Sequence, residues 1–480
     1  MAKNNIKNDA ITPRDENFAQ WYTDICKKAE LMDYSSVKGF IVYLPNSYAL
    51  WENIQDYMNQ LLKKTGHQNV YMPLVIPQSL LQKEADHVEG FAPECAMITK
   101  GGFDELEEPL IVRPTSETLF CEYYAKAVRS YRDLPKLYNQ WCSVVRWEKT
   151  TRPFLRGSEF LWQEGHTVHA TEEEARKETL YILYEVYNKT ARDLLAIPMI
   201  TGQKTEREKF AGAVDTYTME ALMHDGKALQ SGTTHYFGTG FAEAFGMQFQ
   251  DKDNTLKYMH QTSWGASTRL LGAIIMVHGD DNGLVLPPRV APTQLRIIPI
   301  QQKKAGVLDA AYKLRDELTA QGIRVDVDDS DKSPGWKFSD AEVLGIPLRL
   351  EIGPRDLENN QCVIVKRVNG EKVTLPIDDK LGNTIKEMFD DIHNLMYDTA
   401  LKFTQEHTTE VDNYDDFKEV LENKGGYVKM PWCGDEACEV QIKEETTATS
   451  RCIDLEAEPH GTCPICGKQA KHIVYFAKAY

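Results

Sequence analysis

The sequence predicts an α+β protein, in which an antiparallel sheet core with helices is followed by two smaller α/β domains. Three observations support this fold class. Side chains alternate along two segments within residues 139–169, which is typical of an antiparallel hairpin. Strands and helices alternate from residue 295 to residue 368, which predicts a small α/β domain. Close cysteine pairs after residue 430 indicate a further domain.

The composition describes a globular chain, because 42% of the residues are hydrophobic and 26% are charged. A length of 480 residues corresponds to about three domains. The net charge of −17 excludes wrapping nucleic acid over the whole surface, so RNA would bind only at local basic patches. The longest apolar run, 270–277, is too short for a membrane span and the N-terminus is polar. We therefore expect a cytoplasmic protein without membrane contact.

The first 76 residues are predicted to contain two helices and two extended segments. Apolar residues at helical spacing predict helices over 15–31 and 47–66. A short strand is expected at 40–44. Residues 70–76 are also extended, but Pro73 confines them to a sheet edge or an interface.

The hairpin within residues 139–169 collects charged and aromatic side chains on one face. The first strand contributes Cys142, Val144, Arg146 and Glu148. The second strand contributes Phe160, Trp162, Glu164 and His166, and the loop between the strands adds Arg152 and Arg156. Arginine binds phosphate oxygens bidentately and aromatic rings stack on purines, so this face suits a nucleotide. The alternative is an ordinary hairpin whose charges face water.

The runs VVRWE (144–148) and EFLWQEGHT (159–167) resemble motif 2 of class II aminoacyl-tRNA synthetases, in the form of the prolyl family of archaeal and eukaryotic type. Residues 47–76 resemble motif 1, which builds the homodimer interface in this class, although many helix–strand pairs look alike. Residues 260–291 resemble motif 3, with a strand, a Ser-Trp-Gly turn and a buried helix opening at 267–269. The resemblance implies a class II synthetase antiparallel sheet core.

The segment IVRPTSE (111–117) has two interpretations. The resemblance implies that Thr115 and Glu117 hold the substrate amino group, since a hydroxyl and a carboxylate can accept both N–H groups of a secondary ammonium. The alternative is that Thr115 or Ser116 caps a helix that begins near Glu117.

Residues 172–240 complete the predicted core. A helix is expected over 172–195, strands over 216–223 and 230–237, and a helix from about 240. This interval has no room for the editing insertion that bacterial-type prolyl enzymes carry there. His235 has the alternative of an ordinary core histidine.

The resemblance assigns two neighbouring subsites. The proline subsite comprises Thr115, Glu117, Arg146, Trp162, Glu164, Phe210, His235, Ser263 and Gly265. The ATP subsite comprises Arg146, Glu148, Arg156, Phe160, Gln230, Thr233, Ser267 and Arg269. Arg146 and Arg269 are the catalytic residues: Arg146 bridges the proline carboxylate and the α-phosphate, and Arg269 stacks on adenine opposite Phe160. Mg²⁺ accompanies ATP, with ligands unassigned because Gln230 replaces a carboxylate common in the class.

The second domain is predicted from strands at 295–300, 323–327, 347–352 and 361–368, with helices over 307–318 and 336–344. The resemblance implies an anticodon-binding domain with a mixed or parallel sheet that binds tRNA(Pro). Arg355 and Lys366 are candidate contacts, with exposed loop charge as the alternative.

A helix predicted over 385–406 precedes the cysteine pattern Cys433-x4-Cys438 and Cys463-Pro-Ile-Cys466. This spacing predicts a tetrahedral Zn²⁺ site with four thiolates, which is structural because no position stays open. Buried thiols or a redox pair are the alternatives, and Cys452 is not an expected ligand. The resemblance thus implies domains at 1–290 (catalytic), 291–400 (anticodon-binding) and 401–480 (zinc-binding).

The resemblance implies ATP-dependent activation of L-proline to prolyl-adenylate and its transfer to the 3′ end of tRNA(Pro) by a homodimer. A threonyl, histidyl or glycyl enzyme of the same class is one alternative. A non-catalytic RNA-binding paralogue is another, although the presence of Arg146, Arg156 and Arg269 argues against it.

Overall fold

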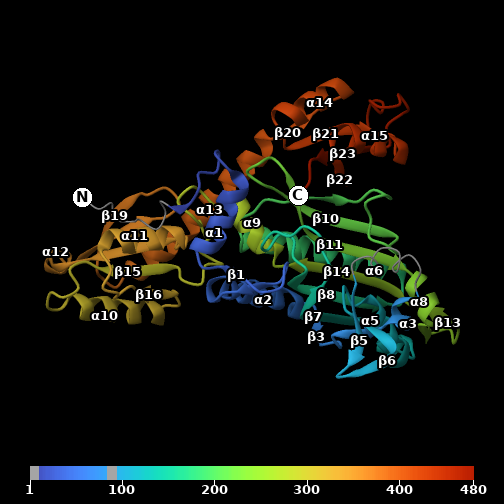
Figure 1. Cartoon of the computed structure of the whole chain (residues 1–480), viewed down its shortest axis with the longest axis horizontal. Helices are drawn as coiled ribbons and strands as arrows, with labels where there is room; N and C mark the ends of the chain where they lie inside the picture. The colour runs from blue at the N-terminus through green and yellow to red at the C-terminus, as the bar shows by residue number, and fades with distance from the viewer. Residues whose placement is uncertain (1–9, 84–94) are drawn as a thin grey trace.

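The computed structural model describes residues 10–83 and 95–480. Within them, an eleven-stranded sheet runs through the larger part of the molecule in the order β20-β21-β23-β22-β9-β10-β11-β14-β8-β7-β3 (Figure 1). From the middle of the sheet to the edge at β3, the strands are β9 (Ile200–Gln203), β10 (Asp215–Leu222), β11 (Ala228–Gly238), β14 (His260–Ser267), β8 (Glu159–His169), β7 (Lys136–Val145) and β3 (Gln68–Asn69). The predicted antiparallel core is confirmed, since neighbours from β9 to β7 are all antiparallel.

The strand register explains why distant sequence segments meet. Cys142 of β7 lies opposite Trp162 of β8, and Glu164 of β8 lies opposite Gly265 of β14. On the other side of β14, Ser263 lies opposite His235 of β11. Because alternate side chains share a face, these strands present one continuous surface of functional groups.

Helices cover the core and match their predicted positions. They are α1 (Phe18–Lys28), α2 (Pro45–Lys64), α6 (Glu172–Tyr181), α7 (Lys189–Asp193) and α9 (Arg269–His278). A π-helical turn, η4 (Ile182–Asn188), joins α6 to α7, so the helix predicted over 172–195 is interrupted rather than regular. Trp21 of α1 and Trp51 of α2 pack with Leu271 of α9 in the same apolar core. Asn17 caps α1 by accepting a hydrogen bond from the backbone of Gln20.

The region before β7 differs from its prediction. Residues 70–74 lie outside any strand, between β3 and β4 (Val75–Pro77). Pro73 has no amide N–H to donate, and the buried Arg113 side chain donates hydrogen bonds to the carbonyls of Met72 and Pro73, so these groups do not join a strand. The strand predicted at 40–44 is β2 (Ile41–Tyr43), paired with β1 (Met32–Tyr34). A second small sheet, β4-β6-β5, was not predicted. Its other strands are β5 (Ala96–Gly101) and β6 (Asp104–Val112).

Short elements complete the first half of the chain. They are α3 (Gln78–Leu81), α5 (Glu117–Ala127), η3 (Tyr131–Asp133), α8 (Gly240–Phe245), β12 (Gln248–Gln250) and β13 (Leu256–Tyr258). The helices expected near residues 117 and 240 are thereby confirmed as α5 and α8.

The second domain lies at one end of the molecule (Figure 1) around a mixed sheet of order β16-β15-β17-β18-β19. Its strands are β15 (Leu295–Pro299), β16 (Val325–Val327), β17 (Leu348–Ile352), β18 (Gln361–Lys366) and β19 (Lys372–Pro376). Its helices are α10 (Val307–Ala320), α11 (Pro334–Val343), α12 (Pro354–Glu358) and α13 (Leu381–Glu406). The mixed sheet is as predicted, whereas β19 and α12 were missed. Helix α13 continues past the boundary predicted at residue 400.

The C-terminal region extends the large sheet. Its elements are β20 (Thr408–Glu410), α14 (Tyr414–Asn423), β21 (Tyr427–Trp432), α15 (Glu436–Thr446), β22 (Thr449–Ile453) and β23 (His472–Ala477). It has a core of its own around Phe417 and Phe476. Ile453 of β22 pairs with Gln203 of β9, so this region joins the antiparallel core at the outer edge of β9. In residues 10–83 and 95–480, no helix has both the length and the apolar character needed to cross a membrane.

Candidate active site

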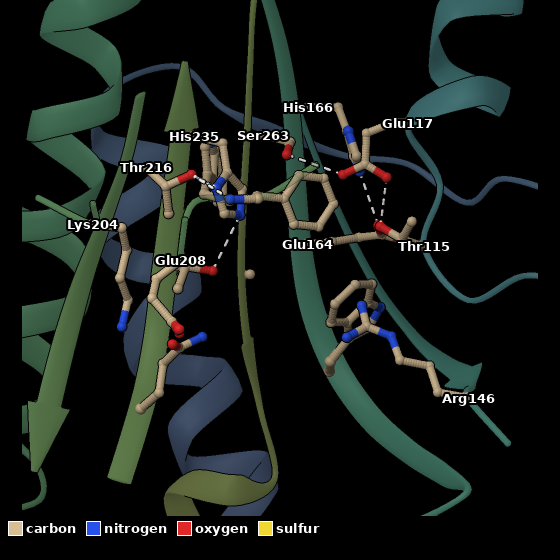
Figure 2. Close-up of a pocket in the computed structure, with 16 residues that line it drawn as sticks. Thr115, Glu117, Arg146, Glu164, His166, Lys204, Glu208, Thr216, His235 and Ser263 are labelled. Carbon is tan, nitrogen blue, oxygen red and sulfur yellow. Dashed lines mark hydrogen bonds and ion pairs between the residues drawn. The ribbon is translucent and has the colours of Figure 1, made fainter. Parts of the chain in front are cut away.

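A pocket of about 160 Å³ opens on the face shared by β8, β11 and β14 (Figure 2). All nine residues predicted for the amino-acid subsite line it: Thr115, Glu117, Arg146, Trp162, Glu164, Phe210, His235, Ser263 and Gly265. Figure 2 shows Glu117, Thr115 and Arg146 on one side of this pocket, with Lys204 and Glu208 on the other. The sheet therefore assembles in one place a set of residues taken from six chain segments.

The Glu117 carboxylate is held in the pocket by two hydroxyl groups. Thr115 Oγ1 donates to Glu117 Oε2 at 2.6 Å, and Ser263 Oγ donates to Glu117 Oε1 at 3.0 Å. Ser116 occupies the N-cap position of α5, as the helix-cap interpretation expected, but neither Thr115 nor Ser116 caps the helix through its side chain. Both side chains instead bond to carboxylates of the pocket, because strand β8 places Glu164 beside the start of α5.

The second carboxylate of the pocket, Glu164, is buried and has several donors. Ser116 Oγ and Gln140 Nε2 donate to Oε1 at 2.5 and 2.6 Å, and His166 Nε2 lies 2.9 Å from Oε2. Burial alone would raise the pKa of Glu164, but the hydrogen bonds from His166 and Ser116 lower it below the usual value. The lowered pKa of Glu164 favours its ionised form, beside Glu117.

His235 closes one wall as a neutral ring. Burial lowers the pKa of His235 to about 3, although the Glu117 charge opposes this shift. Its Nδ1 lies 3.0 Å from Thr216 Oγ1 and its Nε2 lies 3.2 Å from Thr233 Oγ1. The ring stacks on Phe210 with centroids 4.4 Å apart. His235 is therefore both a satisfied buried histidine and a pocket residue, so its two interpretations hold together.

Guanidinium groups gather at the other end of the pocket. Arg146 lies 5.2 Å above the Trp162 ring and 5.6 Å above the Phe160 ring, and its Nε donates to Pro114 O. Arg269 donates to the backbone carbonyls of Leu155 and Gln230. Desolvation, followed by the charges of Arg156 and Arg146, lowers the pKa of Arg269 to about 10. Cations that repel one another in this way favour a polyanionic ligand.

The residues predicted to bind ATP lie partly in the pocket and partly outside it. Arg146, Gln230 and Thr233 line the pocket, whereas Glu148, Arg156, Phe160, Ser267 and Arg269 lie outside its lining. Arg156 Nη1 is 3.7 Å from Glu148 Oε2 at the surface. Arg156 and Phe160 line a second pocket of about 60 Å³. Ser267 Oγ accepts the backbone N–H of Arg269 at 3.1 Å, which fixes the start of α9.

The pocket also contains residues that sequence reasoning did not assign to it. They are His166, Lys204, Glu208, Thr216 and Trp264. Alternation already places His166 on the strand face of Glu164, although it was not assigned to either subsite, and Thr216 lies opposite His235 in the β10–β11 ladder, so register could have added both to the pocket. Lys204 and Glu208 lie in a loop between β9 and β10, where no periodic signal exists.

The four predicted zinc ligands converge. Cys433, Cys438, Cys463 and Cys466 bring their sulfur atoms within 4.8 Å of one another. The sulfur atoms of Cys433 and Cys438 are 3.8 Å apart, and those of Cys466 and Cys433 are 3.5 Å apart. A tetrahedral Zn²⁺ with Zn–S bonds of about 2.3 Å needs sulfur atoms about 3.8 Å apart, so this donor set fits the ion. Cys452 lies on β22, outside the cluster.

The two residues predicted to contact tRNA do not lie together. Arg355 is exposed on α12, which follows the carboxyl end of β17. Lys366 lies opposite Leu348 at the amino end of β17 and pairs with Glu371 at 2.8 Å. Lysines instead gather at the carboxyl end of the sheet, around a cavity of about 590 Å³. They are Lys303, Lys304, Lys332 and Lys337.

Comparisons with known proteins agree along the whole chain. Residues 97–278 match the family described as tRNA synthetase class II core domain (G, H, P, S and T). Residues 294–388 match the anticodon binding domain, and residues 414–480 match the prolyl-tRNA synthetase C-terminal domain. Curated proteins named proline–tRNA ligase from Lachnospira eligens and Agathobacter rectalis are 60% and 59% identical to this chain. Each alignment covers the full length of both proteins.

Proposed function

The chain belongs to the proline–tRNA ligase family of class II aminoacyl-tRNA synthetases, and we propose the residues by which it performs this activity. The enzyme activates L-proline with ATP and transfers the prolyl group to tRNA(Pro). The observation that supports the assignment of residues is the pocket itself. It combines two carboxylates, an aromatic wall and an arginine at the junction with a group of further arginines.

The proline ammonium binds between the two carboxylates. Glu117, oriented by Thr115 and Ser263, and Glu164, oriented by Ser116, supply acceptors for the two N–H groups of a secondary ammonium. Trp162, Phe210 and the neutral ring of His235 surround the apolar ring carbons. A protonated His235 would add a positive charge near the proline ammonium. The low pKa of His235 keeps the ring neutral, which favours binding of a cationic group.

Arg146 binds where two anions must approach each other. Its guanidinium contacts the proline carboxylate and the α-phosphate, which reduces their mutual repulsion. A carboxylate oxygen attacks the α-phosphorus, the bond to the bridging oxygen breaks, and pyrophosphate leaves. Arg156 and Arg269 hold the outer phosphates, and the adenine stacks between Phe160 and the Arg269 plane with its amine on Glu148. Mg²⁺ accompanies ATP and neutralises phosphate charge.

The second half-reaction uses the same pocket. A hydroxyl of the tRNA 3′ end attacks the prolyl carbonyl carbon, and AMP leaves as the acyl bond to its phosphate breaks. Positioning and charge stabilisation supply the catalysis, since neither step requires a covalent intermediate on the protein. The tRNA binds the second domain at the lysine-lined carboxyl end of its sheet, beside Arg355. Lys366, at the opposite end, contacts a different part of the tRNA.

The remaining features are structural. The cysteine cluster holds a Zn²⁺ ion that, when bound, links the end of β21 to the segment around Cys463 and Cys466. Large apolar side chains exposed near the β4-β6-β5 sheet form a homodimer interface: Tyr71, Leu74, Met97 and Phe103. Light scattering on the purified chain tests this dimer. The enzyme acts in the cytoplasm, where translation uses its product.

ATP–pyrophosphate exchange with separate amino acids tests the proposed activity. Exchange that depends on proline, with little response to threonine, histidine or glycine, is the expected result. Exchange with one of the other three would assign the chain to a different branch of the class. Loss of all exchange in a folded protein would support a non-catalytic RNA-binding role.

A further inference from the structure

The loop between β9 and β10 carries part of the amino-acid pocket. Lys204, Glu208 and Phe210 all line the pocket, and all three belong to this loop of residues 204–214. Phe210 stacks on His235, and its backbone N–H donates to Thr216 Oγ1. Figure 2 shows Lys204 and Glu208 on the side of the pocket away from Arg146. The position of this loop therefore determines the shape of one wall.

A fully buried carboxylate ties the start of this loop to the C-terminal region. Glu220 of β10 accepts from Lys204 Nζ at 2.9 Å and from Thr218 Oγ1 at 2.9 Å. Arg451 of β22 donates to the same carboxylate through Nε at 3.2 Å and Nη2 at 3.0 Å. Lys204 and Arg451 are both more than nine-tenths buried. The charges of Lys204 and Arg451 also oppose the rise in the Glu220 pKa that burial would cause.

A second set of contacts holds the next residue of the loop. Thr205 Oγ1 donates to Glu439 Oε1 of α15 at 2.9 Å, and Ser450 Oγ of β22 donates to the same oxygen. At the end of β9, Gln203 pairs with Ile453. A side chain at Gly202 would lie 2.2 Å from the Ile453 carbonyl oxygen, so the two segments approach as closely as glycine allows. The C-terminal region thus contacts the chain both just before and just after Lys204, the first residue of the loop.

We propose that Arg451 is a positioning residue for the proline pocket, acting through Glu220 and Lys204 on the loop of residues 204–214. The C-terminal region then contributes to substrate selection through a buried ion network that ends in the pocket wall. Proline affinity depends on this network, whereas ATP affinity depends chiefly on Arg146, Phe160 and Arg269, which lie outside it. This inference rests on the proposed assignment of Phe210 and its neighbours to the proline subsite.

Arg451→Met tests the network in the full-length protein. Methionine keeps an unbranched apolar stem, and Lys204 and Glu220 remain as a neutral pair, so the fold is retained. In ATP–pyrophosphate exchange we expect the KM for proline to rise about ten-fold, with the KM for ATP changed less than about two-fold. Arg451→Lys, which keeps the charge but loses the fork of donors, should recover about half of that effect on a logarithmic scale.

Lys429→Met is the matched control, because Lys429 pairs with Asp454 at 2.9 Å within the same region but contacts no part of the loop. We expect it to lower thermal stability and leave the KM for proline unchanged. Equal rises in the KM values for proline and ATP in Arg451→Met, or an unchanged KM for proline in a folded variant, would overturn the inference. If Arg451→Met does not fold, Arg451→Lys decides: the expected rise in KM for proline is about three-fold, and no rise overturns the inference.

The reference for both variants is the wild-type chain. Proline-dependent exchange in the wild type with no change in Arg451→Met would reject only the role of Arg451. A wild-type chain without proline-dependent exchange would reject the proposed function, and the inference with it.

Discussion

The arginines near the pocket and the cysteines of the C-terminal region form two clusters, each made of one residue type. The two clusters differ in how close their groups lie and in which parts of the chain supply them. The cysteine sulfurs lie within 4.8 Å of one another and come from two short segments of the chain, residues 433–438 and 463–466. Arg146 follows the end of β7, Arg156 lies in the loop before β8 and Arg269 begins α9, and the charges of Arg146 and Arg156 lower the pKa of Arg269. The four cysteines form a closed group, which suits one permanent cation. The three arginines form an open group, which suits an anion that enters and leaves.

The comparison predicts its largest effect at the closed group. Cys463→Ser removes one of four ligands, and zinc sites of this kind contribute about 10 kcal/mol or more to the structure that they hold. We expect the zinc content, measured by atomic absorption, to fall from about one ion per chain to near zero, with loss of the C-terminal melting transition.

Cys452→Ala is the control for this variant, because Cys452 belongs to the same region but lies outside the cluster. It should retain full zinc. Normal zinc content in Cys463→Ser would reject the four-thiolate site.

Removal of one member of the open group should affect chemistry and spare the fold. In Arg146→Ala we expect ATP–pyrophosphate exchange to fall about 10³-fold or more, because the approach of the two anions loses its shared counter-charge. The melting temperature should change little. Arg129→Ala, at an exposed arginine outside the pocket, should behave as wild type. Exchange within about ten-fold of wild type in Arg146→Ala would contradict the bridging role.

Acid should lower the stability of the folded protein through His235, whose ring lies near the charge of Arg146. Its folded-state pKa of about 3 is below the unfolded value of about 6.5, so the unfolded chain binds the extra proton between these values. Stability from this group is complete above pH 6.5 and decreases as the pH falls toward 3, by about 1.4 kcal/mol at pH 5.5.

Thermal unfolding of wild type and His235→Asn at pH 7.0 and 5.5 measures this contribution. The variant should lose less melting temperature on acidification, by about 2–4 °C. An equal loss in both proteins would show that His235 is not the group responsible.

The smallest expected effect is at the rim of the open group. Glu148→Gln keeps an acceptor for the adenine amine but removes the carboxylate that lies 3.7 Å from Arg156. We expect the KM for ATP to rise about three-fold to five-fold and the KM for proline to stay the same. A change in the KM for proline alone would show that the assignment of Glu148 to the ATP subsite is wrong.

The two groups also differ in how far the sequence predicts them. Cysteine spacing alone predicts the closed group, because its ligands are local in the chain. Alternation along β7 and β8 predicts which face carries Arg146, Trp162 and Glu164, but no local pattern brings Arg269 to them. That step required the resemblance to a family, since it depends on the order of strands in the sheet.

Other features lay beyond sequence reasoning for physical reasons. Thr115 is a residue type favoured both at helix caps and in polar sites, so only the geometry shows that its hydroxyl bonds to Glu117. Lys204 and Glu208 lie in a loop without periodicity. The pairing of Ile453 with Gln203 joins residues far apart in the sequence, and its contact leaves no signal in either segment.

That pairing orders events during synthesis. Strand β22 leaves the ribosome after nearly all of the chain, so the outer edge of β9 stays without this partner until translation is almost complete. A fragment released early would expose a sheet edge, which is prone to aggregate, and would lack the contacts that fix the loop of residues 204–214. A chain that ends before β22 therefore lacks both the strand that covers the edge of β9 and the Arg451 side chain that donates to Glu220.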